Sequence, residues 1–91
     1  MINAYRNAVR THIEQVKAMN QRHRLMVWDI QPDEAKDPTL LSFRAYGSRD
    51  YVDVVIVASG VSGIWEQLPL KRVALPLLVD IQALKNTYLG G

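Results

Sequence analysis

Helix start and stop signals cut the middle of this chain into short elements. Asp37 is a favourable N-cap, and Pro38 after it suits the first position of a helix. Gly47 supplies the left-handed residue with which helices commonly end. We therefore predict a short helix between Asp37 and Gly47.

The residues after Gly47 are rich in β-branched side chains, which favour a strand, but their spacing favours a second helix. Ser48 can cap its start and Gly60 can terminate it. Asp53 would be costly within a buried strand. Apolar residues recur at helical spacing at Tyr51, Val54, Val55 and Ala58. We predict a helix over residues 48–59.

Strands are predicted on either side of this helix pair. Leu25–Ile30 is rich in aliphatic and aromatic residues, as strands are. Leu70–Leu77 is predicted as a second strand, with Pro76 at its end or on an exposed edge. Residues 31–36 are expected to form a polar loop in which Pro32 stops the first strand.

The sequence predicts a helix at the N-terminal end of the chain and leaves two possibilities for the C-terminal end. Residues 2–21 form an amphipathic helix whose apolar stripe is Ile2, Tyr5, Val9, Ile13, Val16 and Met19. Arg6, Arg10 and Lys17 lie together beside this stripe. They form either a solvated flank or an electrostatic contact with an acidic neighbour. Residues 79–91 form a short helix or an extended arm.

Composition indicates a small globular domain. The 91 residues suit one domain, and 48% hydrophobic residues are enough for a core. The absence of cysteine excludes disulfides, thiolate metal sites and a cysteine nucleophile. The longest apolar run, Val54–Ala58, is too short to span a membrane, and residues 1–24 lack the apolar stretch of a secretory signal. We expect a protein that is made in the cytoplasm and does not associate with membranes.

The net charge of +2 is unevenly placed. Residues 1–24 hold five basic residues and one acidic residue, a net charge of +4, and the rest holds six basic and eight acidic residues, a net charge of −2. This asymmetry suits an acidic partner, but it is too weak to indicate nucleic acid.

No motif indicates catalysis. In the predicted turn Gly60–Gly63, the second glycine stands one place too early for a serine nucleophile elbow. His12 and His23 lack the converging ligands of a metal site. Capping, helix first turns and loop solubility account for Asp33, Glu34, Asp37 and Asp50. We expect no enzyme activity, no cofactor and no metal.

Two tryptophans draw attention to protein interfaces, where this residue is enriched. Trp28 on its strand fits the core and an interface equally well, whereas Trp65 after a glycine-rich turn favours an interface or a loop anchor. The candidate protein-interface residues are Arg6, Arg10, Lys17, Trp28, Trp65, Leu84 and Tyr88.

The order of these signals resembles the LysM family, in which a short strand precedes an Asp-Thr-Leu helix start. A Tyr-Gly step then ends the first helix, an Ala-Asn-Gly segment ends the second, and a last strand runs into a proline. The matching residues are Asp37, Thr39, Leu40, Phe43, Tyr46, Gly47, Tyr51, Val55, Ala58, Gly60, Val61, Leu68, Pro69, Val73, Leu75 and Pro76. The likeness is nearest to the small LysM-like tail and baseplate proteins of contractile-tailed bacteriophages. Pro38, Ser59 and Lys71 depart from the pattern, the last two in loops that shape the sugar groove of glycan-binding members.

This resemblance implies an α+β fold with a LysM-like βααβ core, two helices on a two-stranded antiparallel sheet, over residues 25–77. The N-terminal amphipathic helix of residues 1–24 precedes it, and a segment or arm of residues 78–91 follows. The helix residues expected to meet the strands are Leu40, Phe43, Val54, Val55 and Ala58.

The function implied is that of a structural virion protein, a tail or baseplate adaptor assembled in the host cytoplasm. It would contact other tail subunits, in multiple copies, and take no small-molecule substrate. One alternative is a peptidoglycan or other glycan binder that stacks sugars on Trp65 or Tyr51. Another is nucleic-acid binding through the basic helix, with an affinity that falls steeply with salt.

Overall fold

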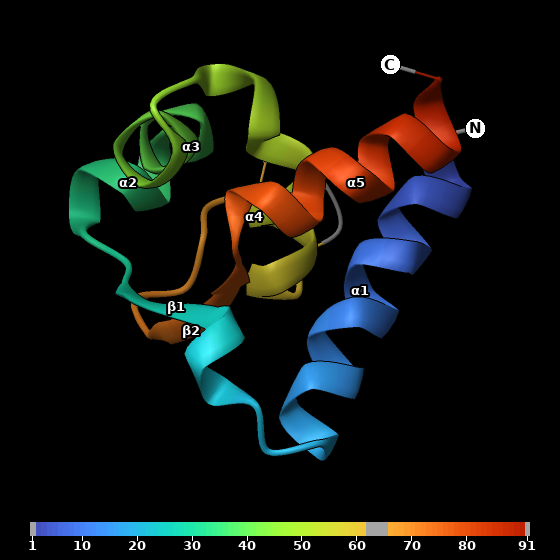
Figure 1. The fold of residues 1–91 in the computed structure, drawn as a ribbon. Coiled ribbons are helices and arrows are strands. Elements are labelled where there is room, and N and C mark those ends of the chain that lie inside the picture. Colours follow the sequence, from blue (N-terminus) through green and yellow to red (C-terminus); the bar gives the residue numbers. More distant parts are fainter. Residues whose placement is uncertain (1, 62–65, 91) are drawn as a thin grey trace.

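The computed structural model describes residues 2–61 and 66–90 and shows an α+β arrangement of helices around a small sheet (Figure 1). In chain order the helices are α1 (Ile2–Ala18), α2 (Pro32–Lys36), α3 (Pro38–Tyr46), α4 (Val52–Ser59) and α5 (Leu78–Leu89). The strands are β1 (Leu25–Asp29) and β2 (Arg72–Pro76), and the single 3-10 turns are η1 (Arg22–Arg24) and η2 (Arg49–Tyr51). Among these elements, none of the helices is long and apolar enough to cross a membrane.

The sheet has two antiparallel strands, in which Leu25 lies opposite Pro76 and Asp29 opposite Arg72. Both predicted strands are present, each a little shorter than expected. One face of the sheet carries Met26 and Trp28 from β1 and Val73 and Leu75 from β2, and these side chains pack in or against the core. The helices therefore cover this face.

The predicted signals around the first central helix are confirmed. Asp37 caps α3 by accepting hydrogen bonds from the backbone N–H of Thr39 (3.1 Å) and from its hydroxyl (2.6 Å). Gly47 ends α3 in the left-handed region, with φ of 77°. Because each of these motifs is decided within a few residues, the bounds of α3 follow from local chemistry.

The helix predicted over residues 48–59 is also confirmed, in preference to a strand. Ser48 caps η2 by accepting from the backbone N–H of Asp50, and η2 leads directly into α4. Gly60 terminates α4 with φ of 77°, in the left-handed conformation that favours glycine. The rest of the turn predicted over Gly60–Gly63, residues 62 and 63, lies outside the described residues.

The prediction of a polar loop over residues 31–36 is wrong, because helix α2 occupies that segment. Pro32 does not merely stop the strand but begins this helix. Gln31 and Glu34 form a capping box at the start of α2, in which each side chain accepts a hydrogen bond from the backbone N–H of the other residue. Glu34 was expected to keep a loop soluble, yet it is one of the most buried residues, with 1% exposure.

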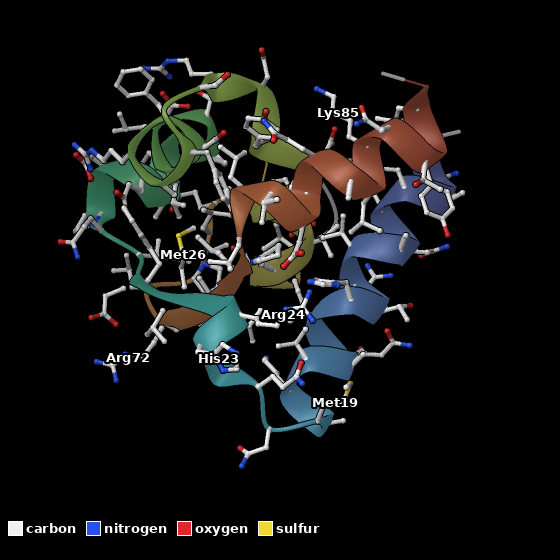
Figure 2. All side chains as sticks on the ribbon, in the orientation of Figure 1. Met19, His23, Arg24, Met26, Arg72 and Lys85 are labelled. Carbon is white, nitrogen blue, oxygen red and sulfur yellow. The ribbon has the colours of Figure 1, made fainter. Side chains whose placement is uncertain are left out.

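Two residues expected to be apolar contacts are instead exposed. Phe43 was expected to meet the strands but is 52% exposed, because α3 turns Leu41, Ser42 and Tyr46 inward. Met19 lies beyond the end of α1 and is 63% exposed, at the foot of the helix in Figure 2. The remaining predicted residues are buried (Val54 and Val55) or half-buried (Leu40 and Ala58).

Both ends of the chain contribute to one core. The stripe of α1 buries Tyr5, Val9, Ile13 and Val16, and α5 buries Ile81, all at 6% exposure or less. Residues 78–89 form a helix rather than an extended arm, and this helix packs along α1. As a result α1 begins, and α5 ends, at the same corner of the molecule (Figure 1).

Candidate interaction surfaces beside the first helix

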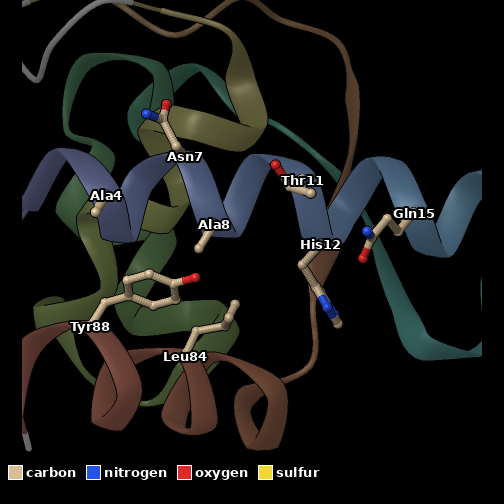
Figure 3. A pocket seen from close by; sticks show the side chains of 8 residues that line it. All are labelled: Ala4, Asn7, Ala8, Thr11, His12, Gln15, Leu84 and Tyr88. Atoms are coloured by element: carbon tan, nitrogen blue, oxygen red, sulfur yellow. The ribbon is translucent and has the colours of Figure 1, made fainter.

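A shallow groove of about 580 Å³ runs between α1 and α5. Small and polar side chains of α1 form one wall, and Leu84 and Tyr88 of α5 form the other. Figure 3 shows Leu84 and Tyr88 extending from α5 toward Ala8, with Ala4 further along the same wall. Both predicted interface residues of the C-terminal segment thus lie in a hollow that a neighbouring side chain can enter.

A cluster of three polar side chains lies beside this groove, which we call the α1–α5 groove. His12 Nε2 lies 3.4 Å from Asp80 Oδ2, and Arg24 Nη2 donates to Asp80 Oδ1 at 3.2 Å. Asp80 stands in the first turn of α5, and its side chain is only 18% exposed. Arg24 thereby ties the start of α5 to η1, and His12 of α1 lies beside the same carboxylate. Sequence reasoning placed His12 at a helix edge and could not find Asp80, because no local motif joins them.

The opposite flank of α1 borders a series of hollows that continue onto the sheet. The first, about 570 Å³, is lined by Asn3, Arg6, Asn7, Arg10, Ile56, Val57, Gly60 and Val61. The second, about 210 Å³, is lined by Arg10, Ile13, Glu14, Lys17, Val57 and Ala58. The third, about 350 Å³, is lined by Lys17, Leu25, Val27 and Ala74. Because Arg10 and Lys17 are shared by neighbouring hollows, we treat all three as one α1–α4 groove.

The three predicted basic residues line this groove, but they differ in how their charge is balanced. Arg6 pairs with Asp53 of α4 at 2.5 Å, so its charge is compensated within the molecule. Arg10 donates to the neutral amide of Asn7 at 3.0 Å, and Lys17 has no carboxylate partner among the described residues. The groove therefore keeps positive charge at Arg10 and Lys17, with Glu14 between them.

Trp28 is partly buried and packs against the core. Its indole Nε1 donates to Glu34 Oε1 at 3.1 Å. Glu34 also accepts from the backbone of Gln31 (2.9 Å) and from Arg44 (3.0 Å), so this buried carboxylate is fully engaged. Trp65, the other candidate, lies outside the described residues.

The described residues contain no group of three or more histidine or acidic side chains that could hold a metal ion. Comparison with known proteins gives no match to a protein-family model, to a curated protein or to a solved structure. The two grooves beside α1 are therefore interpreted from their own geometry.

Proposed function

We propose that this chain is an assembly adaptor that binds neighbouring protein subunits through the two grooves beside α1. The proposal rests on the position of the two grooves, one on each side of α1. The basic residues Arg6, Arg10 and Lys17 line one side of α1, and Leu84 and Tyr88 line the other. Mixed apolar and charged hollows of this kind suit protein partners, since apolar contact supplies affinity and charge sets the register.

We further propose that the core is LysM-like and that the assembly is a contractile bacteriophage tail or baseplate. The elements from β1 to β2 support this proposal, because α3 and α4 stand between two antiparallel strands as the resemblance implies, with the short α2 inserted before them. Helices α1, α2 and α5 are additions to that plan. Of these, α1 and α5 supply the walls of the α1–α5 groove, which a minimal βααβ unit would lack.

Contacts around Tyr51 count against the glycan-binding alternative. The ring of Tyr51 meets that of Tyr46 at a centroid distance of 5.5 Å, and Lys85 Nζ lies 5.3 Å from its centroid. A sugar would have to displace these neighbours before it could stack. The connection from α4 to β2 is also tied to α2, because the Leu68 backbone N–H donates to Ala35 O at 3.0 Å.

The proposal can be tested by photo-crosslinking in assembling particles. A photoreactive residue would replace Ala8 in the α1–α5 groove, Lys17 in the α1–α4 groove, or, as a control, the exposed Lys36 on α2. We expect crosslinks from Ala8 and Lys17 to tail subunits in purified particles, and none from Lys36. Absence of the chain from particles, or crosslinks from Lys36 alone, would refute the proposal. Strong retention on purified cell-wall sacculi would favour the glycan alternative.

A further inference from the structure

The outer edge of β1 presents backbone groups that β2 does not use. The Ile30 backbone N–H donates to Lys71 O at 3.1 Å. Residues of an antiparallel strand alternate between bonding their partner and pointing away from it. Following the register from Ile30, the N–H and C=O groups of Leu25, Val27 and Asp29 point to the outer edge.

Most of these outward groups lack a partner in the described part of the chain. Asp29 O accepts from Gln31 Nε2 at 3.1 Å. The outward groups of Val27 make no hydrogen bond to any described residue, whereas the N–H of Leu25 belongs to the last turn of η1. Edge strands of natural proteins are usually protected by lysine, proline or a covering element, and Val27 at the centre of this one supplies no such protection.

The sheet face next to this edge exposes an apolar side chain at its centre. Val27 is 66% exposed and, with Leu25 and Ala74, lines the third hollow of the α1–α4 groove. Figure 2 shows Met26 directed toward the helices and Arg72 directed away from the molecule. The face that carries Arg72 is exposed at Val27, Asp29 and Arg72 and is covered at its other end, where Pro76 is buried. Arg72 and Asp29 pair at 2.9 Å on it and leave Val27 without a charged neighbour in the register.

A second copy of the chain matches this edge. If two β1 strands pair antiparallel about a two-fold axis at Val27, then Val27 lies opposite its own counterpart and Leu25 opposite Asp29. The N–H and C=O of Val27 then meet those of the other copy, and the N–H of Asp29 meets the C=O of Leu25, so the groups that are free in one copy complement those that are free in the other.

We propose that two copies of this chain associate through β1 and form one continuous four-stranded sheet. A two-stranded sheet is only marginally stable, and pairing would give each copy a wider one. Val27 and Leu25 also line the third hollow of the α1–α4 groove, but the α1–α5 groove shares no residue with β1. A chain that stays monomeric would therefore leave the crosslinks expected from Ala8 unchanged, so the two proposals can fail separately.

The association can be measured by sedimentation equilibrium of the purified full chain. We expect a reversible dimer. Val27→Pro removes an N–H that points away from β2, so the fold tolerates it while the pairing loses a bond in each copy, weakening the dimer about tenfold or more. Val27→Lys keeps the N–H but sets like charges face to face, and should also give monomers.

Val79→Lys is the matched control, because Val79 on α5 is 67% exposed, as Val27 is 66% exposed. It should dimerise like the original chain, with circular dichroism confirming that all variants fold. Two outcomes would overturn the proposal. One is a monomeric original chain up to about 1 mM. The other is a dimer that Val27→Lys and Val79→Lys leave equally tight.

Discussion

Glu34 shows how one residue can organise a segment. Its carboxylate accepts hydrogen bonds from Trp28 on β1, from the backbone of Gln31 before α2, and from Arg44 on α3. A buried carboxylate is stable only when its oxygens are satisfied in this way. Glu34 thereby holds three consecutive elements in place.

Glu34→Ala should therefore destabilise the protein strongly, because it leaves the Trp28 and Gln31 donors without their acceptor. We expect a loss of about 3 kcal/mol in the free energy of unfolding, measured by urea denaturation and followed by tryptophan fluorescence. Asp33→Ala is the control: Asp33 also pairs with Arg44, but its side chain is 54% exposed and should matter far less. Equal losses in the two variants would contradict the role given to Glu34.

At the scale of the elements, α5 depends on charges contributed by distant parts of the chain. Asp80 in its first turn faces His12 of α1 and Arg24 of η1. Ile81, the next residue, is fully buried. The start of α5 is thus fixed by both burial and charge, whereas its last turn, where Leu89 is 39% exposed, has less to hold it.

Asp80→Ala should loosen α5 without unfolding the rest. Loss of the hydrogen bond from Arg24 should cost on the order of 1 kcal/mol, which raises hydrogen exchange in residues 78–89 roughly fivefold. Exchange in α3 and α4 should stay unchanged. Asp50→Ala, at an exposed carboxylate in the first turn of η2, serves as the comparison. If α5 exchanges at the same rate in both variants, the cluster does not anchor it.

Elements whose ends are set by local capping residues could be predicted from the sequence, whereas elements that depend on distant contacts could not. The caps at Asp37, Gly47 and Gly60 act within a few residues, so α3 and α4 were placed correctly. Helix α2 was missed because its N-cap is Gln31 rather than one of the residues that usually occupy that position. The inward face of α3 was misjudged because Leu40, Leu41 and Phe43 are all apolar and spacing alone did not choose among them.

The candidate site was only partly foreseeable for a related reason. The basic row on α1 follows from helical periodicity, but the Arg6–Asp53 pair spans 47 positions and no local pattern indicates it. The contact of His12 with Asp80 likewise joins the two ends of the chain. Such pairs arise only when α1, α4 and α5 pack together, so they depend on tertiary structure.

At the scale of the whole molecule, two buried tyrosines should make the free energy of unfolding vary with pH in the alkaline range. Burial, with a smaller effect of the Asp53 charge, raises the pKa of Tyr5 from its ordinary value of 10.0 to about 12. Burial raises the pKa of Tyr46 still further, and its hydroxyl donates to Pro76 O at 2.8 Å. Above the ordinary pKa, the unfolded chain therefore loses these protons while the folded chain keeps them.

The free energy of unfolding should accordingly be insensitive to these tyrosines below pH 10.0 and should fall as pH rises from there through about 12. Urea denaturation across this range measures the slope. The double variant Tyr5→Phe with Tyr46→Phe should show a shallower fall, although it is less stable at neutral pH by the lost hydrogen bond to Pro76, about 1 kcal/mol. An unaltered slope in the double variant would show that other groups govern alkaline unfolding.

The corner shared by the start of α1 and the end of α5 has a practical consequence (Figure 1). We expect that a linker between these two ends would allow the chain order to be permuted by opening another connection, such as the turn around Asn20, at little entropic cost. Likewise, a fluorophore or affinity tag attached to either end would report from the same place, and the two attachments would be interchangeable.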